Sequence, residues 1–303
     1  MEVKRIKKNE IDTFTSLSEK PNKFGKIVLN LWDNGLSYPK WCFIIEGRDQ
    51  VLGRVGYWSP HRGNSTARIF GLSLPWESEQ LFKTGENLLK ESFEYLKDNE
   101  VKYIDSQLDS ADGEKFVLSQ NLYQYLDMQK IQSKKRFILK TKNITSADNN
   151  RLRFISLKET DVDFFIKVLK DVTKGTLDRE DRLNVKKDDK LKAAEKHFYS
   201  LKSIEYSPEN WFLAYDKQEI IGLIIPQVLS NTKGTINYIG VIPEQRGKGY
   251  VIDLLDKGIK NLIKRNIDII IADIDVENYP MKKALLNMNF KEQKELINYR
   301  KKL

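Results

Sequence analysis

The chain has 303 residues, of which 40% are hydrophobic, and this is enough for two domains that each bury a core. Its apolar runs fall short of the roughly 18 residues of a membrane span and its N-terminus is charged, so we expect no membrane contact and a cytoplasmic location. The net charge of +9 comes from lysines scattered among acids and not from one basic block. A nucleic-acid partner is therefore not expected.

Residues that form disulfides or bind metals are few. Cys42 is the only cysteine, which excludes an internal disulfide and a cysteine-based metal cluster. The two histidines, His61 and His197, lie far apart in the sequence, so we expect no metal site. Cys42 falls inside the apolar strand pattern of residues 41–45, where we expect a small buried side chain and not a reactive thiol.

The hydrophobic periodicity of the first half predicts a domain of strands and helices. Its apolar runs predict strands at 3–6, 41–45, 51–57, 67–72, 101–104 and 136–140. Helices are predicted up to about Leu36, along the apolar stripe of residues 81–96, and at 111–119. A polar stretch at 141–150, rich in Thr, Asn, Ser and Asp, follows and is expected to be a linker.

The second half shows the same order of elements more clearly. Strands are predicted at 153–157, 211–215, 220–225, 235–242, 267–271 and 297–300. Helices are predicted from Val162, from about Lys187 to Ser203, along the stripe of Leu254, Leu255, Ile259 and Leu262, and before the last strand. The predicted order is βααβββαβαβ.

Two matches between the halves indicate copies of one fold. Trp41 and Val51-Leu52-Gly53 correspond to Trp211 and Ile220-Ile221-Gly222. Phe70-Gly71-Leu72-Ser73-Leu74-Pro75 similarly corresponds to Ile239-Gly240-Val241-Ile242-Pro243. Both matches occur in the same order, which favours a tandem repeat. We therefore predict an α/β (α+β) protein with domains at 1–140 and 151–303, joined by the linker 141–150.

The most informative segment joins a predicted strand to a predicted helix and reads Ile239-Gly240-Val241-Ile242-Pro243-Glu244-Gln245-Arg246-Gly247-Lys248-Gly249-Tyr250-Val251. A turn there directs backbone N–H groups and the positive end of the helix dipole into one concavity, which makes an anion site. Gly247 and Gly249 let the backbone curl and approach a phosphate, and Arg246 and Lys248 add positive charge at the rim. The spacing is neither that of a Walker loop nor the three-glycine dinucleotide fingerprint.

This segment resembles the pyrophosphate loop of the GNAT superfamily of N-acetyltransferases, whose pattern is Gln/Arg-x-x-Gly-x-Gly/Ala between the fourth strand and the third helix. Residues 246–249 fill the pattern, whereas Val251 departs at its final Gly/Ala position and leaves that turn more crowded. A second stretch, residues 273–281 with Ala284 and Phe290, is similar to the family's strand, asparagine-containing turn and short helix. The resemblance covers the whole second half.

The resemblance implies two tandem GNAT-like domains, each a central mixed, mostly antiparallel sheet flanked by helices and splayed between strands 4 and 5. It also implies acetyl-CoA, or another short acyl-CoA, as the cofactor. The residues implied for cofactor binding are Ile239, Gly240 and Val241 along the pantetheine arm, Arg246, Gly247, Lys248, Gly249, Tyr250 and Val251 around the pyrophosphate, and Asn278 from the other side. The Val241 amide is implied as an oxyanion donor.

The implied reaction is direct transfer of an acetyl group to the primary amine of a small molecule or a peptide, with a base for the ammonium proton and an acid for the thiolate. Asp273 is the candidate base, and Asp275 points the same way by the two-residue period of a strand. Many family members carry a tyrosine seven residues after the turn asparagine, but Leu285 stands there. Tyr238 is the first candidate acid, and Tyr279, Tyr250 or water are the alternatives. Solvated carboxylates at a strand end, and simple packing of Tyr238, stay open as alternatives.

The corresponding loop of the first half, residues 75–81, has no glycine and carries Glu77 and Glu79, which would repel a pyrophosphate. The first domain is therefore expected to be a degenerate copy without a phosphate loop. Two other functions stay open. One is a non-catalytic acyl-CoA-binding or sensing protein, and the other is a tRNA-dependent aminoacyl transferase, since tandem copies of this fold also occur in such enzymes. A monomer or a homodimer is expected.

Overall fold

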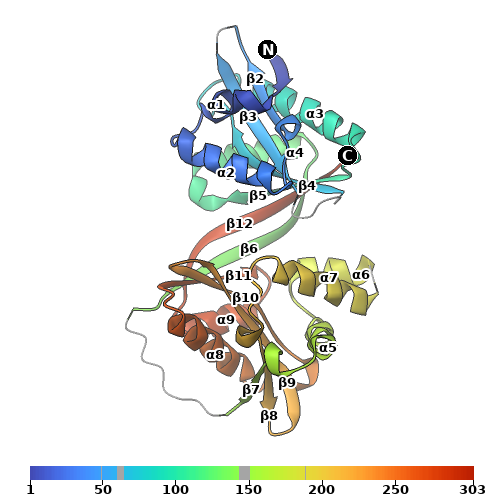
Figure 1. Cartoon of the computed structure of the whole chain (residues 1–303), viewed down its shortest axis with the longest axis vertical. Helices are drawn as coiled ribbons and strands as arrows, with labels where there is room; N and C mark the ends of the chain where they lie inside the picture. Colours follow the sequence, from blue (N-terminus) through green and yellow to red (C-terminus); the bar gives the residue numbers. More distant parts are fainter. Residues whose placement is uncertain (49, 60–64, 143–150, 188) are drawn as a thin grey trace. The chain divides into compact units, whose positions relative to one another are not determined.

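The computed structural model of the chain describes residues 1–48, 50–59, 65–142, 151–187 and 189–303. The chain divides into two compact units, Met1–Ile131 with Leu296–Leu303 (unit 1) and Gln132–Glu295 (unit 2) (Figure 1). This division differs from the boundary predicted at 141–150, because two long strands contribute residues to both units. They are β6 (Gln129–Lys140) and β12 (Lys291–Lys302). Residues 143–150 of the predicted linker lie outside the described residues.

Unit 1 is a mixed sheet with helices, as predicted. Its strands are β1 (Glu2–Arg5), β2 (Cys42–Glu46), β3 (Val51–Trp58), β4 (Thr66–Ser73) and β5 (Tyr103–Asp109). Its helices are α1 (Ile11–Thr15), α2 (Pro21–Asp33), α3 (Leu81–Asp98) and α4 (Glu114–Tyr125). The strands follow the order β1-β2-β3-β4-β5 and then β12. β4 and β5 pair in parallel, and the other neighbours in this unit are antiparallel.

Unit 2 has the same plan. Its strands are β7 (Arg153–Ser156), β8 (Phe212–Asp216), β9 (Glu219–Ser230), β10 (Lys233–Val241) and β11 (Ile269–Asp275). Its helices are α5 (Val162–Val172), α6 (Arg179–Lys187), α7 (Lys190–Lys202), α8 (Tyr250–Lys264) and α9 (Tyr279–Asn287). The order is β7-β8-β9-β10-β11 and then β6, with β10 and β11 parallel and the other pairs antiparallel. The sequence-based order missed α6.

Helices cover both faces of the unit 2 sheet (Figure 1). On one face, the apolar stripe of α8, with Leu254, Leu255 and Leu262, packs with residues of α9 and β11 into one core cluster. On the other face, α5 and α7 form a second cluster around Trp211 and Phe165. Residues with a helical period thus bury one side of each helix, as their spacing predicted.

Both units have a splay between their fourth and fifth strands. In unit 2, β10 and β11 pair over three residues, from Lys233 to Thr235 against Ile269 to Ile271, and β10 then continues beside β9 alone up to Val241. In unit 1, β4 and β5 likewise pair over three residues, Thr66 to Arg68 against Tyr103 to Asp105. The predicted fold class, with a splay in each copy, is confirmed.

The two copies exchange their last strands. The C-terminal part of β12 pairs with β5, from Leu296↔Asp109 to Lys302↔Tyr103, and so completes the sheet of unit 1. β6, which follows unit 1 in the sequence, pairs with β11 from Lys134↔Asp275 to Lys140↔Ile269 and completes the sheet of unit 2. Each sheet is therefore closed by a strand from the other half of the sequence.

The unit 1 copy departs from unit 2 at its splay. A Cβ on Gly71 of β4, which has a φ of +62°, would lie 2.5 Å from the Phe24 ring. The rings of Phe14, Phe24 and Phe70 pack together, with centroids 5.9 to 6.4 Å apart. Arg54 lies over the Phe24 ring and donates to the Gly71 carbonyl. Aromatic side chains thus fill the space on this side of β4.

The single cysteine and the predicted absences can be placed on the structure. Cys42 is buried, as predicted, and burial raises the pKa of its thiol to about 12. His61 lies outside the described residues, within which no group of three His, Cys, Asp or Glu side chains could hold a metal ion. No helix in the described part of the chain is long and apolar enough to cross a membrane.

Candidate functional site

The glycine loop joins β10 to α8 through a short 3-10 turn at Pro243–Gln245. Gly247 and Gly249 have φ values of +78° and +82°, in the left-handed region that other residues rarely adopt. Gly249 is also the N-cap of α8, so the first N–H groups of that helix and its positive dipole end open at the loop. Because residues 246–249 are exposed, these donors are available to an anion.

The two cations of the loop make different contacts. The Arg246 guanidinium folds back and donates to the carbonyls of Val241 at 3.0 Å, Val172 at 2.9 Å and Gly175 at 3.2 Å. It therefore ties the loop to the segment that follows α5. Lys248 reaches only as far as the side chain of Gln245, at 2.6 Å, and remains at the rim of the loop.

The side chains at the start of α8 point into the protein. Tyr250 is buried and its hydroxyl donates to Asp216 at 2.6 Å, while Val251 is half-buried against the core under α8. Both residues thus offer backbone N–H groups to the loop and not side chains. Arg151 stacks on the Tyr250 ring at 4.1 Å and donates to the Lys248 carbonyl at 3.2 Å, which adds a cation that the sequence analysis missed.

The edge of β10 at the splay presents backbone groups. Ile242 donates its N–H to the Ile221 carbonyl on β9 at 2.9 Å. Hydrogen-bonded and non-bonded residues alternate in an antiparallel pair, so Gly240 also faces β9, and the N–H groups of Ile239 and Val241 point the other way, towards the splay. The Val241 carbonyl accepts from Arg246, so the backbone group that Val241 presents to the splay for a ligand is its N–H.

The two predicted bases on β11 are both engaged. Arg136 of β6 binds Asp273 through two hydrogen bonds, of 2.7 and 2.6 Å. Asp275 is buried and accepts from the side chain of Gln132 and from the backbone N–H of Arg179 and Glu277, at 3.0 to 3.2 Å. These contacts hold both carboxylates in place.

Asn278 lies at the end of β11, where it caps α9. Its side-chain oxygen accepts the backbone N–H of Met281 at 3.2 Å, and its own backbone N–H donates to the Asp275 carbonyl at 2.9 Å. The side-chain amide still has two N–H donors for a ligand. Tyr279, next to it, is exposed.

Tyr238 belongs to a cluster of three side chains that come from β10, α6 and α7. Its hydroxyl donates to Asp181 at 3.1 Å, and Nδ1 of His197 lies 3.6 Å from the other oxygen of Asp181. The rings of Tyr238 and His197 meet edge to face with centroids 4.6 Å apart. Burial is the main reason why the pKa of Asp181 is raised, and burial together with the Asp181 charge raises the pKa of Tyr238 well above its ordinary value.

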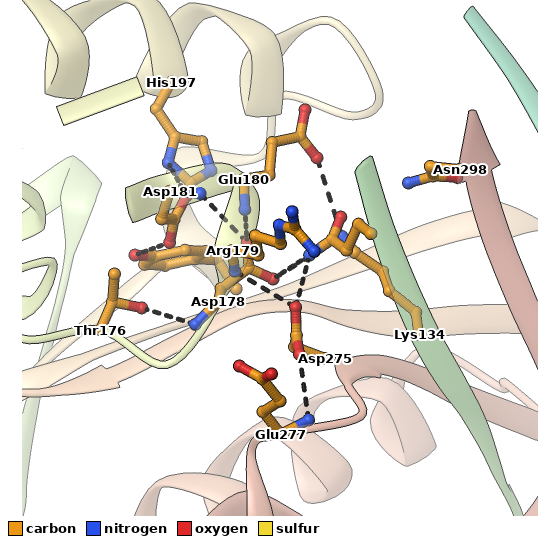
Figure 2. Close-up of polar contacts among 12 residues, drawn as sticks. Lys134, Thr176, Asp178, Arg179, Glu180, Asp181, His197, Asp275, Glu277 and Asn298 are labelled. Atoms are coloured by element: carbon orange, nitrogen blue, oxygen red, sulfur yellow. Dashed lines mark hydrogen bonds and ion pairs between the residues drawn. The ribbon is translucent and has the colours of Figure 1, made fainter. Parts of the chain in front are cut away.

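The start of α6 connects the two sides of the splay. Asp178 accepts from the backbone N–H of Glu180 and Asp181 and so caps the helix, while the Arg179 N–H binds Asp275 on β11 (Figure 2). On the other side, Asp181 holds Tyr238 of β10. Asp181 was not predicted as a site residue because α6 has no apolar stripe; Asp178 before an acidic first turn is the signal that could have predicted this helix. His197 lies on the predicted helix α7, but no local pattern indicates that it meets Tyr238.

The chain is similar to known proteins in its second half and in its fold. Residues 178–290 match the model of the Acetyltransferase (GNAT) family. No curated protein is significantly similar in sequence to the chain. A solved GCN5-related N-acetyltransferase from Sphaerobacter thermophilus superposes with a TM-score of 0.69 at 13% identity, over 99% of this chain and 95% of that one.

Two further solved structures share the fold. A tandem GNAT protein from the clavulanic acid biosynthesis pathway has a TM-score of 0.54 at 11% identity, with 86% of this chain and 82% of that chain covered. A GCN5-related glucosamine N-acetyltransferase region of a fungal multi-domain β-N-acetylglucosaminidase has 0.65 at 12%, covering 98% of this chain and 38% of that one. Sequence identities this low show similarity of fold only. Residues 178–290 of this chain thus match the GNAT acetyltransferase family, and the chain has the tandem GNAT fold.

Proposed function

We propose that unit 2 is an acetyl-CoA-dependent N-acetyltransferase that acts on the primary amine of a small molecule or a peptide. The observation that carries this proposal is the position of the glycine loop directly beyond the edge of β10 that has left β11. One continuous path thus offers N–H groups to a diphosphate at Gly247 to Val251 and to an extended amide-containing arm at Ile239 and Val241. These two features fit acetyl-CoA, whose carbonyl would receive a hydrogen bond from the Val241 N–H.

The transfer needs one bond to form and one to break. The neutral amine nitrogen attacks the thioester carbon, the C–S bond breaks, and the electron pair leaves with the sulfur. One proton leaves the ammonium before attack, and a second passes from nitrogen to solvent or to the thiolate. Asp273, Asp275 and Tyr238 stay our sequence-based candidates for these proton transfers, and Asn278 for contact with the cofactor.

Unit 1 is proposed to be non-catalytic. Residues 75–80 contain no residue with positive φ, and Gln80, the N-cap of α3, has a φ of −81° where Gly249 has +82°. Two carboxylates in this loop oppose a diphosphate, and the aromatic rings beside Gly71 fill the space at the splay. These differences favour a single working site.

Calorimetry with acetyl-CoA tests the proposal. Gly249→Glu should weaken binding by at least about tenfold, which is about 1.4 kcal/mol, because it places a side chain and a negative charge at the α8 N-terminus and strains the backbone. Gly113→Glu is the matched control, since Gly113 is the N-cap of α4, has a φ of +59° and has open space around its Cβ position. The control should bind acetyl-CoA as the wild type does.

Turnover and tRNA-binding measurements distinguish the proposed acetyltransferase from the two other functions. Release of CoA thiol is measured with glucosamine, a short aliphatic diamine and a peptide with a free N-terminus, and the buried Cys42 will not interfere with a thiol reagent. Binding without turnover of any amine would favour a non-catalytic acyl-CoA-binding protein. No binding of acetyl-CoA to the wild type would contradict the proposal, and binding to tRNA that weakens steeply with salt would then favour an aminoacyl transferase.

A further inference from the structure

Asp181 lies beside the imidazole of His197, as a carboxylate that orients a histidine does (Figure 2). Asp181 also accepts a hydrogen bond from Tyr238. With Nδ1 turned to Asp181, Nε2 is the ring nitrogen from which a proton can be exchanged. The side chain of His197 is 23% exposed and that of Asp181 only 12%. The carboxylate is thus shielded from water, whereas the imidazole can be reached.

The cluster lies where an acceptor must approach the proposed thioester. Tyr238 is on the part of β10 that no longer pairs with β11, three residues before Val241, and this is about 10 Å along a strand. The first turn of α6 carries Asp181 and is bound to both strands of the splay, through Tyr238 on β10 and Asp275 on β11. His197 of α7 lies beside Asp181 and against the Tyr238 ring, and is therefore next to the part of β10 that has left β11.

The other carboxylates at the splay already have fixed partners. Asp273 accepts two hydrogen bonds from the Arg136 guanidinium. Asp275 accepts from three donors, including the backbone of α6. Tyr238 has a pKa well above its ordinary value, so it keeps its proton and donates a hydrogen bond to Asp181.

We propose that His197 is the general base of unit 2, that Asp181 is its positioning residue, and that Tyr238 holds Asp181 in turn. This inference rests on the proposed acetyltransferase function. His197 Nε2 takes one proton from the acceptor ammonium, and the neutral amine attacks the thioester. The imidazolium formed is stabilised by the Asp181 carboxylate and then releases its proton to solvent.

Several charged groups surround this pair and affect its pH dependence. Asp178 and Glu180 lie on the same turn of α6 and act on the Asp181 carboxylate, and Arg246 acts on Tyr238 from the glycine loop. Lys134 of β6 lies 3.7 Å from Asp178 and 3.9 Å from Glu180 and offsets part of their charge. The pH profile must therefore be measured on the full chain with these groups intact.

The test compares His197→Gln with His61→Gln, which removes the only other histidine of the chain. With the panel amine that turns over fastest, His197→Gln should lower kcat by about 10²–10⁴-fold and leave acetyl-CoA affinity within about twofold. Its kcat/KM should rise with pH only as the amine itself loses its proton, at higher pH than in the wild type. His61→Gln should keep the wild-type rate and profile.

A second variant distinguishes proton transfer from a structural role. Imidazole added to His197→Ala should restore turnover, and substituted imidazoles should do so in the order of their basicity. Two results would overturn the inference: a wild-type pH profile in His197→Gln, or a loss of activity in His197→Ala that no imidazole restores. Neither result would contradict the proposed function, which acetyl-CoA binding and turnover by the wild type would still support. Absence of turnover in the wild type would overturn both.

Discussion

At the scale of single residues, Arg246 and Lys248 make different contacts although both belong to the glycine loop. Sequence alone assigned both cations to the rim of a phosphate site. The Arg246 guanidinium donates to three backbone carbonyls. Two of them, those of Val172 and Gly175, belong to the segment that leads to α6. The loop proposed for the cofactor is therefore tied to the segment that carries Asp181.

Arg246→Gln should loosen this connection, and Lys248→Gln should not. Hydrogen bonds from a charged donor contribute about 1.5–3 kcal/mol each at most, so the loss of three should increase amide exchange of residues 172–176. Lys248→Gln removes one contact, to Gln245, and should leave that exchange unchanged. Exchange measured by mass spectrometry checks both variants. Equal exchange in Arg246→Gln and the wild type would show that the three bonds do not hold the segment.

The Asp181 carboxyl should make stability depend on pH. Its folded pKa is raised above the usual value of 3.8, mainly by burial, so its protonated form favours the folded state. This contribution is complete below the unfolded pKa and is lost as pH rises through the folded pKa. Asp181→Asn removes the titration, and the variant should therefore gain stability relative to the wild type as pH rises above about 4.

Denaturant unfolding of both proteins between about pH 4 and 8 measures this difference. His197→Gln is a second variant for this measurement. It removes the nearby group that favours the charged form of Asp181, so its stability should fall with rising pH more steeply than that of the wild type. A difference between wild type and Asp181→Asn that does not change with pH would contradict the raised pKa. Greater stability with lower activity in Asp181→Asn would be the expected compromise of a buried functional carboxylate.

At the scale of elements, the close approach of β9 and β10 shapes the edge that we assign to the cofactor arm. A Cβ on Gly222 would lie 2.0 Å from the Gly240 carbonyl oxygen and 3.0 Å from Val241 Cα. These are backbone atoms, which cannot turn aside as a flexible side chain can. Gly222 is therefore required by the contact between strands, and the recurrence of Gly53 at the matching place in unit 1 has the same basis.

Gly222→Ala should push β10 away from β9. We expect a loss of about 1–3 kcal/mol of stability and weaker acetyl-CoA binding, because the N–H groups of Ile239 and Val241 move. Gly53→Ala is the matched control, with a Cβ 3.0 Å from the Ser73 carbonyl oxygen in unit 1. It should affect stability without changing acetyl-CoA affinity. Unchanged affinity in Gly222→Ala would argue against the β10 edge as the binding surface.

At the scale of the whole molecule, the exchange of β6 and β12 makes each core depend on both halves of the sequence. Ile297 is in the second half, yet it is buried in the core of unit 1 with residues of α3 and β5. Phe137 is in the first half, yet it is buried in the core of unit 2 with residues of α8 and β11. A fragment that begins at residue 151 would therefore lack a strand of unit 2.

Two core variants form a reciprocal test of this exchange. Ile297→Ala should destabilise unit 1 by about 2–5 kcal/mol, and Phe137→Ala should destabilise unit 2 by about 3–5 kcal/mol. Amide exchange should rise in β5 and α4 for the first variant, and in β10, β11 and α8 for the second. The opposite assignment, with Ile297→Ala affecting α8, would mean that each half folds with its own last strand.

The sequence by itself determined most of the secondary structure, the repeat and the glycine loop. Apolar spacing along α8 and the strand pattern of residues 41–45 are local properties, and so is the freedom of Gly247 and Gly249 to adopt a positive φ. The match of Trp41 and Gly53 with Trp211 and Gly222, together with the match of residues 70–75 with 239–243, predicted two copies. Helix α6 escaped this reasoning because its anchors, Asp275 and Tyr238, are far away in the chain.

Only the tertiary structure decided which strands pair and which polar groups meet. The two-residue period of a strand predicts on which face of the sheet a side chain lies, but not which strand is its neighbour. The sequence therefore contains no local signal for the partners of β6 and β12. The same holds for Asp273 and Asp275, whose partners Arg136 and Gln132 come from the exchanged strand. The meeting of Asp181, His197 and Tyr238 likewise depends on three elements whose packing joins residues that the sequence keeps apart.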